Sequence, residues 1–294
     1  MLRWLALLLL AALAAPAMAA DKDYDIVRIN ADTVLFDGVI GAQSARQLLA
    51  AIDERTRFLI ITSQGGSASD AIPVGRELRR RNITLIVKEY CYSACANYLF
   101  LGAHSKILLN NALLGFHGAA GVGLDLEQRN ALRSAATPAA AQASLSEQID
   151  RIAREELDYF EEAHISYDLF VYANAQLKPV ADQLASKPPQ FEGQVVVRAG
   201  ARAWTYPSAQ LNAAFAKVAA LEKTGIKARL DGHLRMQGKY SDMVYFPRRE
   251  TLERFGVQGI AAYAYPADQA TMKRLHQHHF AGAIVGDDPA GATP

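Results

Sequence analysis

The alternation of strand and helix signals between residues 57 and 118 restricts the fold more than any other feature of this chain. Residues 58–61 and 83–87 are compact apolar runs, typical of strands that are buried on both faces. Between these runs, Ser67 is followed three residues later by Asp70. This spacing resembles the capping-box motif and predicts the start of a helix at Ser67. Strand, helix and strand at this spacing predict parallel pairing through crossover connections, and therefore an α/β fold.

Further elements are expected on both sides of this segment. The remaining predicted strands are 24–30, 33–36, 107–109, 113–116 and 194–198, and the remaining predicted helices are 42–53, 93–103, 145–163, 208–223 and 247–256. Hydrophobic residues make up 51% of the 294 residues and charged residues 21%, so the chain can bury a sizeable core.

The net charge and the cysteine count exclude several classes of protein. A formal charge of +1 argues against a nucleic-acid partner bound by phosphate neutralisation. Two cysteines are too few for a four-cysteine zinc module. The cluster of His276, His278 and His279 does not converge on one metal at helical spacing, so we interpret it as solvated surface. The sequence therefore predicts neither a metal nor a cofactor.

The first twenty residues have the layout of a signal peptide, and we exclude them from the fold. Arg3 supplies a positive charge, an apolar stretch follows, and the small residues Ala17 and Ala19 suit a cleavage site. We expect a periplasmic or secreted protein; the alternative is an uncleaved N-terminal membrane anchor. The mature chain is predicted as one domain over 21–280, with an insertion at about 174–241 and a flexible tail at 281–294.

Three segments with reactive or permissive residues follow neighbouring strands of the predicted sheet. They are 62–66 with two adjacent glycines, 91–95 with a serine between two cysteines, and 115–118 with a histidine between glycines. In parallel sheets, ligands gather outside the carboxyl ends of the strands, so these segments are expected to meet.

Together the three segments supply the parts of a nucleophilic site. Ser93 at the start of a helix has free backbone amides beside it, and His117 could act as its base. Gly65 and Gly66 can bring backbone N–H groups close to a substrate carbonyl because no side chain blocks the approach. Each feature alone is commonly a helix cap, a turn or a core histidine, and the inference rests on their joint occurrence.

The same segments resemble the Clp protease proteolytic-subunit family, and more closely its secreted bacterial relatives. The resemblance is carried by ITSQGG at 61–66, CYSAC at 91–95, LFLGA at 99–103 and FHG at 116–118. It implies a crotonase-like ββα spiral fold with a mainly parallel sheet, an inserted segment and a long protruding helix used in subunit assembly. It also implies Ser93 as nucleophile, His117 as general base, and the amides of Gly66 and Ala94 as oxyanion donors, with Gly65 in the supporting turn.

The third member of the implied Ser-His-Asp triad departs from the family pattern. Asp242 precedes a segment that resembles the short helix after the family's aspartate, with a two-residue offset. Asp168 lies nearer the usual separation but lacks the surrounding motif. We favour Asp242 over Asp168. The loop at 63–66 also lacks the family's proline.

Cys91 and Cys95 bracket Ser93, and two interpretations stay open for them. In a regular helix Cβ atoms at i and i+4 lie about 5–6 Å apart, further than a disulfide allows. A bond is therefore expected only if Cys91 precedes the regular helix; the alternative is two buried thiols. Lys88 could suggest a Ser-Lys pair, but His117 has the better motif.

The sequence thus predicts a secreted serine hydrolase, a peptidase that forms an acyl-enzyme on Ser93 and acts on short or unfolded peptides. We expect no ATPase partner after export, and the superfamily favours a homo-oligomer. The first alternative is a catalytically inactive scaffold or binding protein of the periplasm. A further alternative is crotonase-type acyl-thioester chemistry, which is disfavoured outside the cytoplasm.

Overall fold

A seven-stranded sheet forms the centre of the protein. The computed structural model describes residues 23–119, 121–123, 139–185, 190–207, 210–237, 243–280 and 282–287. The strand order is β1-β2-β3-β4-β5-β13, and β6 also pairs with β4. The strands are β1 (Tyr24–Arg28), β2 (Thr33–Ile40), β3 (Phe58–Gly66), β4 (Thr84–Tyr92), β5 (Ser105–Leu108), β6 (Leu113–Gly115) and β13 (Ile260–Tyr263). Only the β1–β2 pairing of this sheet is antiparallel, so the mainly parallel α/β fold predicted from the sequence is confirmed.

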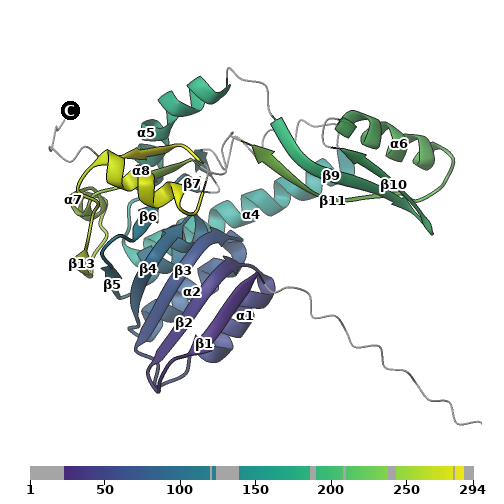
Figure 1. The fold of residues 1–294 in the computed structure, drawn as a ribbon. Coiled ribbons are helices and arrows are strands. Elements are labelled where there is room, and N and C mark those ends of the chain that lie inside the picture. Colours follow the sequence, from purple (N-terminus) through teal and green to yellow (C-terminus); the bar gives the residue numbers. More distant parts are fainter. Residues whose placement is uncertain are drawn as a thin grey trace, which may run out of the picture.

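Two helices cover one face of this sheet. They are α1 (Ala42–Ala51) and α2 (Ala68–Arg80), shown behind β1 to β4 in Figure 1. The start of α2 follows the predicted cap, because the Ser67 hydroxyl accepts a hydrogen bond from the Asp70 amide at 3.4 Å. The apolar side of α2 is fully buried between the sheet and its neighbours.

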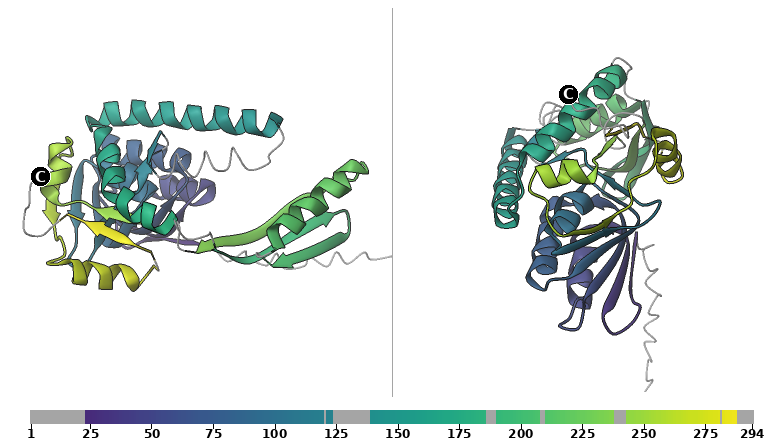
Figure 2. Two further views of the ribbon diagram at one scale, coloured as in Figure 1. Left: turned by 90° about the horizontal axis from the view of Figure 1, so that it is seen from above. Right: turned by 90° about the vertical axis from the view of Figure 1, so that its left-hand side faces the viewer.

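The long helix α4 (Ala139–Ala163) packs its second half against α2 and the π-helix η1 (Cys95–Phe100). The Tyr98 hydroxyl of η1 donates to the Glu156 carboxylate, which is fully buried. The predicted helix at 145–163 is present, ends where expected and begins earlier, at Ala139. In Figure 2 this helix runs along one side of the molecule and extends beyond the sheet.

β4 carries an irregularity just before its carboxyl end. Ile61 pairs with Val87, and Ser63 pairs with Cys91, so three residues of β4 stand opposite a single residue of β3. Bulges of this kind bend a strand and re-aim its end, and they are common next to active sites. Here the bulge lies directly before the Cys91 to Cys95 turn.

Two short strands lie beside the end of β6. β12 (Val244–Phe246) pairs in parallel with β14 (Ile284–Gly286). Tyr245 of β12 also bridges Phe116 in the antiparallel sense, through two backbone hydrogen bonds of 2.9 and 2.7 Å. The remaining elements around them are β7 (Gly118–Ala119), β8 (Val122–Gly123), α5 (Asp168–Ala185), α7 (Arg249–Arg254) and α8 (Gln269–Gln277).

The prediction of a flexible tail at 281–294 is wrong for the residues from Ile284 to Asp287. The apolar Ile284 and Val285 complete a strand pair with β12. Asp287 then accepts hydrogen bonds from the Tyr245 hydroxyl at 2.5 Å, the Arg248 amide at 2.8 Å and the Thr251 hydroxyl at 2.6 Å. This carboxylate fixes the end of the chain to the start of α7. Residues 281 and 288–294 lie outside the described part.

We expect Asp287→Ala to lower the free energy of unfolding by about 2–4 kcal/mol, because three donors lose one charged acceptor. Chemical denaturation of the purified protein measures this loss. The matched control is Asp182→Ala, which removes an exposed ion pair with Lys178 and should change stability by no more than about 0.5 kcal/mol. Equal effects of the two substitutions would show that Asp287 has no anchoring role.

Residues 190–237 form a separate antiparallel unit in the described part of the predicted insertion. It consists of β9 (Gln190–Ala199), β10 (Arg202–Pro207), α6 (Leu211–Lys223) and β11 (Arg229–Gln237), with the strand order β10-β9-β11. A small core of Val195, Val197 and Ala214 holds α6 on the sheet. Figures 1 and 2 both show this unit standing away from the seven-stranded sheet. The predicted start of the insertion at about residue 174 falls inside α5, which continues to Ala185.

Candidate active site

Ser93 lies at the junction between β4 and η1. Its backbone φ of 55° is in the left-handed region, which L-residues rarely adopt. The Ser93 amide donates to the Gly115 carbonyl on β6 at 3.0 Å, and the Ser93 carbonyl accepts from the Asn97 amide at 2.8 Å. A serine on a sharp, strained strand-to-helix turn is the arrangement of a nucleophile in many hydrolases.

The two glycines at the end of β3 pack directly against this turn. Gly65 and Gly66 have φ values of 93° and 144°, which glycine adopts without strain. A Cβ atom on Gly65 would lie 2.8 Å from both the Ala94 amide nitrogen and the Ser93 Cβ atom. The structure therefore brings Gly65, Ser93 and Ala94 together as the sequence analysis expects.

His117 follows β6, next to the strand that carries Ser93. Tyr92 pairs with Gly115, so Ser93 lies one residue beyond this pair and His117 two residues beyond it. The imidazole is almost fully buried, with 8% exposure. Among the contacts described, no hydrogen bond joins the Ser93 hydroxyl to the ring. Such bonds are often long in enzymes without substrate and shorten when the substrate binds.

Asn97 is a site residue that the sequence analysis missed. Its side-chain Nδ2 donates to the Gly118 carbonyl at 2.7 Å, and thereby ties η1 to the segment that carries His117. Its Oδ1 atom is buried and accepts no hydrogen bond from the described residues. The available signal was a single polar residue inside an otherwise apolar run, four positions after the serine.

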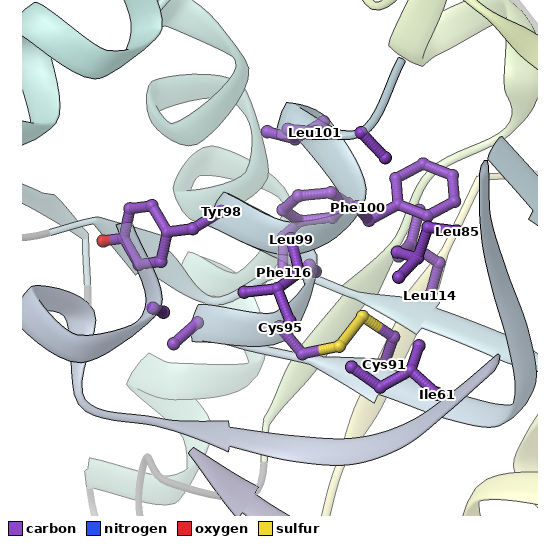
Figure 3. Close-up of a cluster of buried hydrophobic side chains, with 14 of the residues drawn as sticks. Ile61, Leu85, Cys91, Cys95, Tyr98, Leu99, Phe100, Leu101, Leu114 and Phe116 are labelled. Atoms are coloured by element: carbon purple, nitrogen blue, oxygen red, sulfur yellow. A yellow bond between two sulfur atoms is a disulfide. The ribbon is translucent and has the colours of Figure 1, made fainter. Parts of the chain in front are cut away.

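A disulfide joins Cys91 and Cys95 across the serine turn, with Cα atoms 5.3 Å apart. Cys91 belongs to β4 and precedes the helix, which is the condition under which the sequence allowed a bond. Both cysteines are fully buried, and Figure 3 shows the bond beside Ile61 and Phe116 in the apolar core. The following helix is a π-helix rather than the predicted α-helix, a rare form that is frequent at functional sites.

We expect the double substitution Cys91→Ala and Cys95→Ala to lower the free energy of unfolding by about 2 kcal/mol, the chain-entropy value for a very short loop. Thermal denaturation of the exported protein measures this loss. Non-reduced peptide mapping of wild type should show the linked pair. Two free thiols in wild type exported to the periplasm would contradict the prediction.

Of the two candidates for the third triad residue, the structure describes only Asp168. Asp242 lies outside the described residues; the next residue, Met243, is buried with 1% exposure. Asp168 begins α5 with an exposed side chain, and no hydrogen bond or ion pair among the described residues links it to His117. The described contacts therefore do not support Asp168 as the third triad residue, although its separation from His117 in sequence is near that of the family.

Two other residues named from the sequence have different environments from those expected. The Lys88 ammonium pairs with Glu89 at 2.9 Å in a half-exposed position. The hydrogen bond to Glu89 raises the pKa of Lys88, which makes this lysine a poor general base.

His276 is 1% exposed and its Nδ1 lies 3.2 Å from the Tyr92 hydroxyl, so its assignment to solvated surface is wrong. Burial raises the pKa of Tyr92.

Comparison with known proteins gives structural likeness at low similarity. No family model matches the sequence, and no curated protein matches it. Among solved structures, a ClpP1 point mutant from Listeria monocytogenes is 19% identical, over 49% of this chain and 79% of its own, with a TM-score of 0.34. An enoyl-CoA hydratase from Bacillus anthracis is 12% identical over 33% of this chain, with a TM-score of 0.27.

A membrane-bound stomatin-specific protease in complex with a substrate peptide is 16% identical over 34% of this chain, with a TM-score of 0.25. The chain spans 51% of the enoyl-CoA hydratase and 61% of a methylmalonyl-CoA decarboxylase that it also matches. Over the described ranges, no helix is long and apolar enough to cross a membrane.

Proposed function

We propose that the protein is a secreted serine hydrolase, a peptidase that acts through an acyl-enzyme on Ser93. The observation that carries this proposal is the left-handed serine turn, whose amide is bonded to Gly115 two residues before His117. The proposed nucleophile and base thus follow two paired strands, at their carboxyl ends, where substrates bind in α/β folds. The Cys91–Cys95 disulfide supports an oxidising compartment such as the periplasm.

In the proposed reaction His117 takes the proton from the Ser93 hydroxyl, whose oxygen attacks the scissile carbonyl. The C–N bond then breaks, His117 gives the proton to the leaving amine, and water later hydrolyses the ester. The Ala94 amide at the helix start and the Gly66 amide stabilise the oxyanion. Ser67 donates its amide to Ile40 on β2 at 2.8 Å. Because amides alternate in direction along a strand, we infer that the Gly66 amide points to the opposite edge, toward the end of β4.

Asp242 is our candidate for the residue that orients His117. The bridge between Phe116 and Tyr245 is antiparallel, so Val244 stands at the next register position, opposite His117. Asp242 is two residues before Val244 and would lie diagonally across from the histidine if the pairing continued. The substrates in this proposal are short or unfolded peptides, without an ATPase partner, and the protein is a homo-oligomer.

A fluorophosphonate probe tests the proposal. It should label the folded wild type covalently and leave Ser93→Ala unlabelled, because only an activated serine reacts with it. Ser69→Ala is the matched control, since it removes an exposed serine from the start of α2 and should leave labelling unchanged. Labelling that persists in Ser93→Ala would refute the assignment of the nucleophile.

The second candidate function is a catalytically inactive scaffold or binding protein. The altered glycine loop favours it, because Gln64 stands where the Clp-like serine peptidases have a proline. A wild type that folds normally and reacts with no fluorophosphonate would support this candidate over the hydrolase.

A further inference from the structure

A pocket of about 540 Å³ opens where β5 and β13 end, away from the serine turn. Its walls come from the turn after β5, from the start of α7 and from the loop after β13. Pockets of this volume hold small ligands or short peptide segments. None of the residues assigned to the hydrolase reaction lines it.

Arg248 lines this pocket, and among the described residues no carboxylate pairs with its guanidinium. Its guanidinium lies over the Tyr265 ring, 5.2 Å from the ring centroid. Its buried Nε atom donates no hydrogen bond within the described residues. A buried N–H of a charged group without an acceptor is costly unless a ligand supplies one.

The neighbouring charges define which ligand fits. Arg249 also lines the pocket, but its Nε donates to Glu253 at 2.7 Å. Glu250, at the rim, is exposed and repels ligands in proportion to their negative charge. A ligand with a single negative charge and two oxygens matches the planar guanidinium better than a doubly charged phosphate.

The two tyrosines of the pocket have no hydroxyl proton left for a ligand. Tyr263 donates to the Pro247 carbonyl at 2.7 Å, and Tyr265 donates to the Phe246 carbonyl at 2.9 Å. They therefore present ring surface, and the directional contact with a ligand rests on Arg248.

We propose that this pocket binds the C-terminal carboxylate of a peptide, with Arg248 as the residue that recognises it. Val244 stands opposite His117 in the register, and Arg248 follows Val244 by four residues. The Cα atoms of Val244 and Arg248 are therefore at most about 13 Å apart. We infer that a peptide cleaved at Ser93 ends in this pocket. This last step rests on the proposed hydrolase function; carboxylate binding itself does not.

Binding is tested on the Ser93→Ala variant, so that no turnover occurs. N-acetyl-triglycine is titrated into the millimolar range, and NMR follows the Arg248 Nε–Hε signal and the Ala264 amide signal. The free acid should shift both signals in a saturable manner. The C-terminal amide of the same peptide should bind at least about tenfold more weakly, since it lacks the charge that Arg248 recognises.

Two substitutions in the Ser93→Ala background complete the test, followed by the Ala264 signal. Arg248→Gln should weaken binding of the free acid at least about tenfold, and Arg249→Gln less than about twofold, although both remove one positive charge from the pocket. Equal binding of acid and amide, or no shift by either, overturns the proposal. A stronger response to inorganic phosphate than to the free acid also overturns it. Failure of fluorophosphonate labelling in wild type would refute the hydrolase and leave this binding result unaffected.

Discussion

Replacement of His117 by glutamine should reduce fluorophosphonate labelling and peptide hydrolysis by about three orders of magnitude or more. Glutamine fills a similar volume in the buried site and keeps hydrogen-bonding capacity, but it cannot take a proton from Ser93. Without that transfer the serine hydroxyl remains a weak nucleophile. Second-order labelling rates of the two proteins measure the effect directly.

The control for this substitution is His104→Gln. His104 is exposed after η1 and lies outside the site, so labelling should stay at the wild-type rate. Thermal denaturation of all three proteins verifies that they are folded. A loss of less than about tenfold in folded His117→Gln would exclude His117 as the general base, since that role contributes at least about a hundredfold.

Gly65→Ala should strongly reduce labelling and destabilise the fold. The added Cβ would meet the Tyr92 carbonyl oxygen and the Ala94 amide nitrogen, both of them backbone atoms that cannot rotate away. Its φ of 93° adds strain for any L-residue. We expect the unfolding free energy to fall by about 3 kcal/mol and labelling by about a hundredfold or more, because the oxyanion donors shift.

Two other glycines separate the causes of this effect. Gly225 has a φ of 76° and open space around its Cα, so Gly225→Ala reports the backbone strain alone, about 1 kcal/mol. Gly41 has neither positive φ nor neighbours within 4 Å, and Gly41→Ala should be within about 1 kcal/mol of wild type. If Gly65→Ala behaves like Gly225→Ala in stability and labelling, the close packing of the glycine loop has no catalytic role.

The strands and the meeting of the three motifs could be predicted because they depend on local patterns. Buried parallel strands are continuous apolar runs, and their order along the chain fixes which ends meet. The helix α5 was not predicted; Pro179 lies inside it, and a proline normally indicates the end of a helix, although the predicted helix α2 also contains one, Pro73. Likewise, β14 is a strand only because β12 offers it a partner far away in sequence.

The bulge in β4 and the π-helix also escaped prediction, since both are local changes of register that tertiary packing selects. His276 was misassigned for a similar reason. Its neighbours in sequence are polar, and the Tyr92 hydroxyl that it contacts belongs to β4, 184 residues earlier. The register position of Val244 opposite His117 also depends on a contact that is distant in sequence, the bridge between Phe116 and Tyr245.

The covalent link around Ser93 has a consequence for the cell that makes the protein. The turn is closed by a bond between two thiols that stay reduced in the cytoplasm. With the export that we propose, newly made chains would pass through the cytoplasm with an open turn, and the turn would close only after translocation. The proposed hydrolase would then spare the peptides of its own producer during synthesis, without an inhibitor or a removable propeptide.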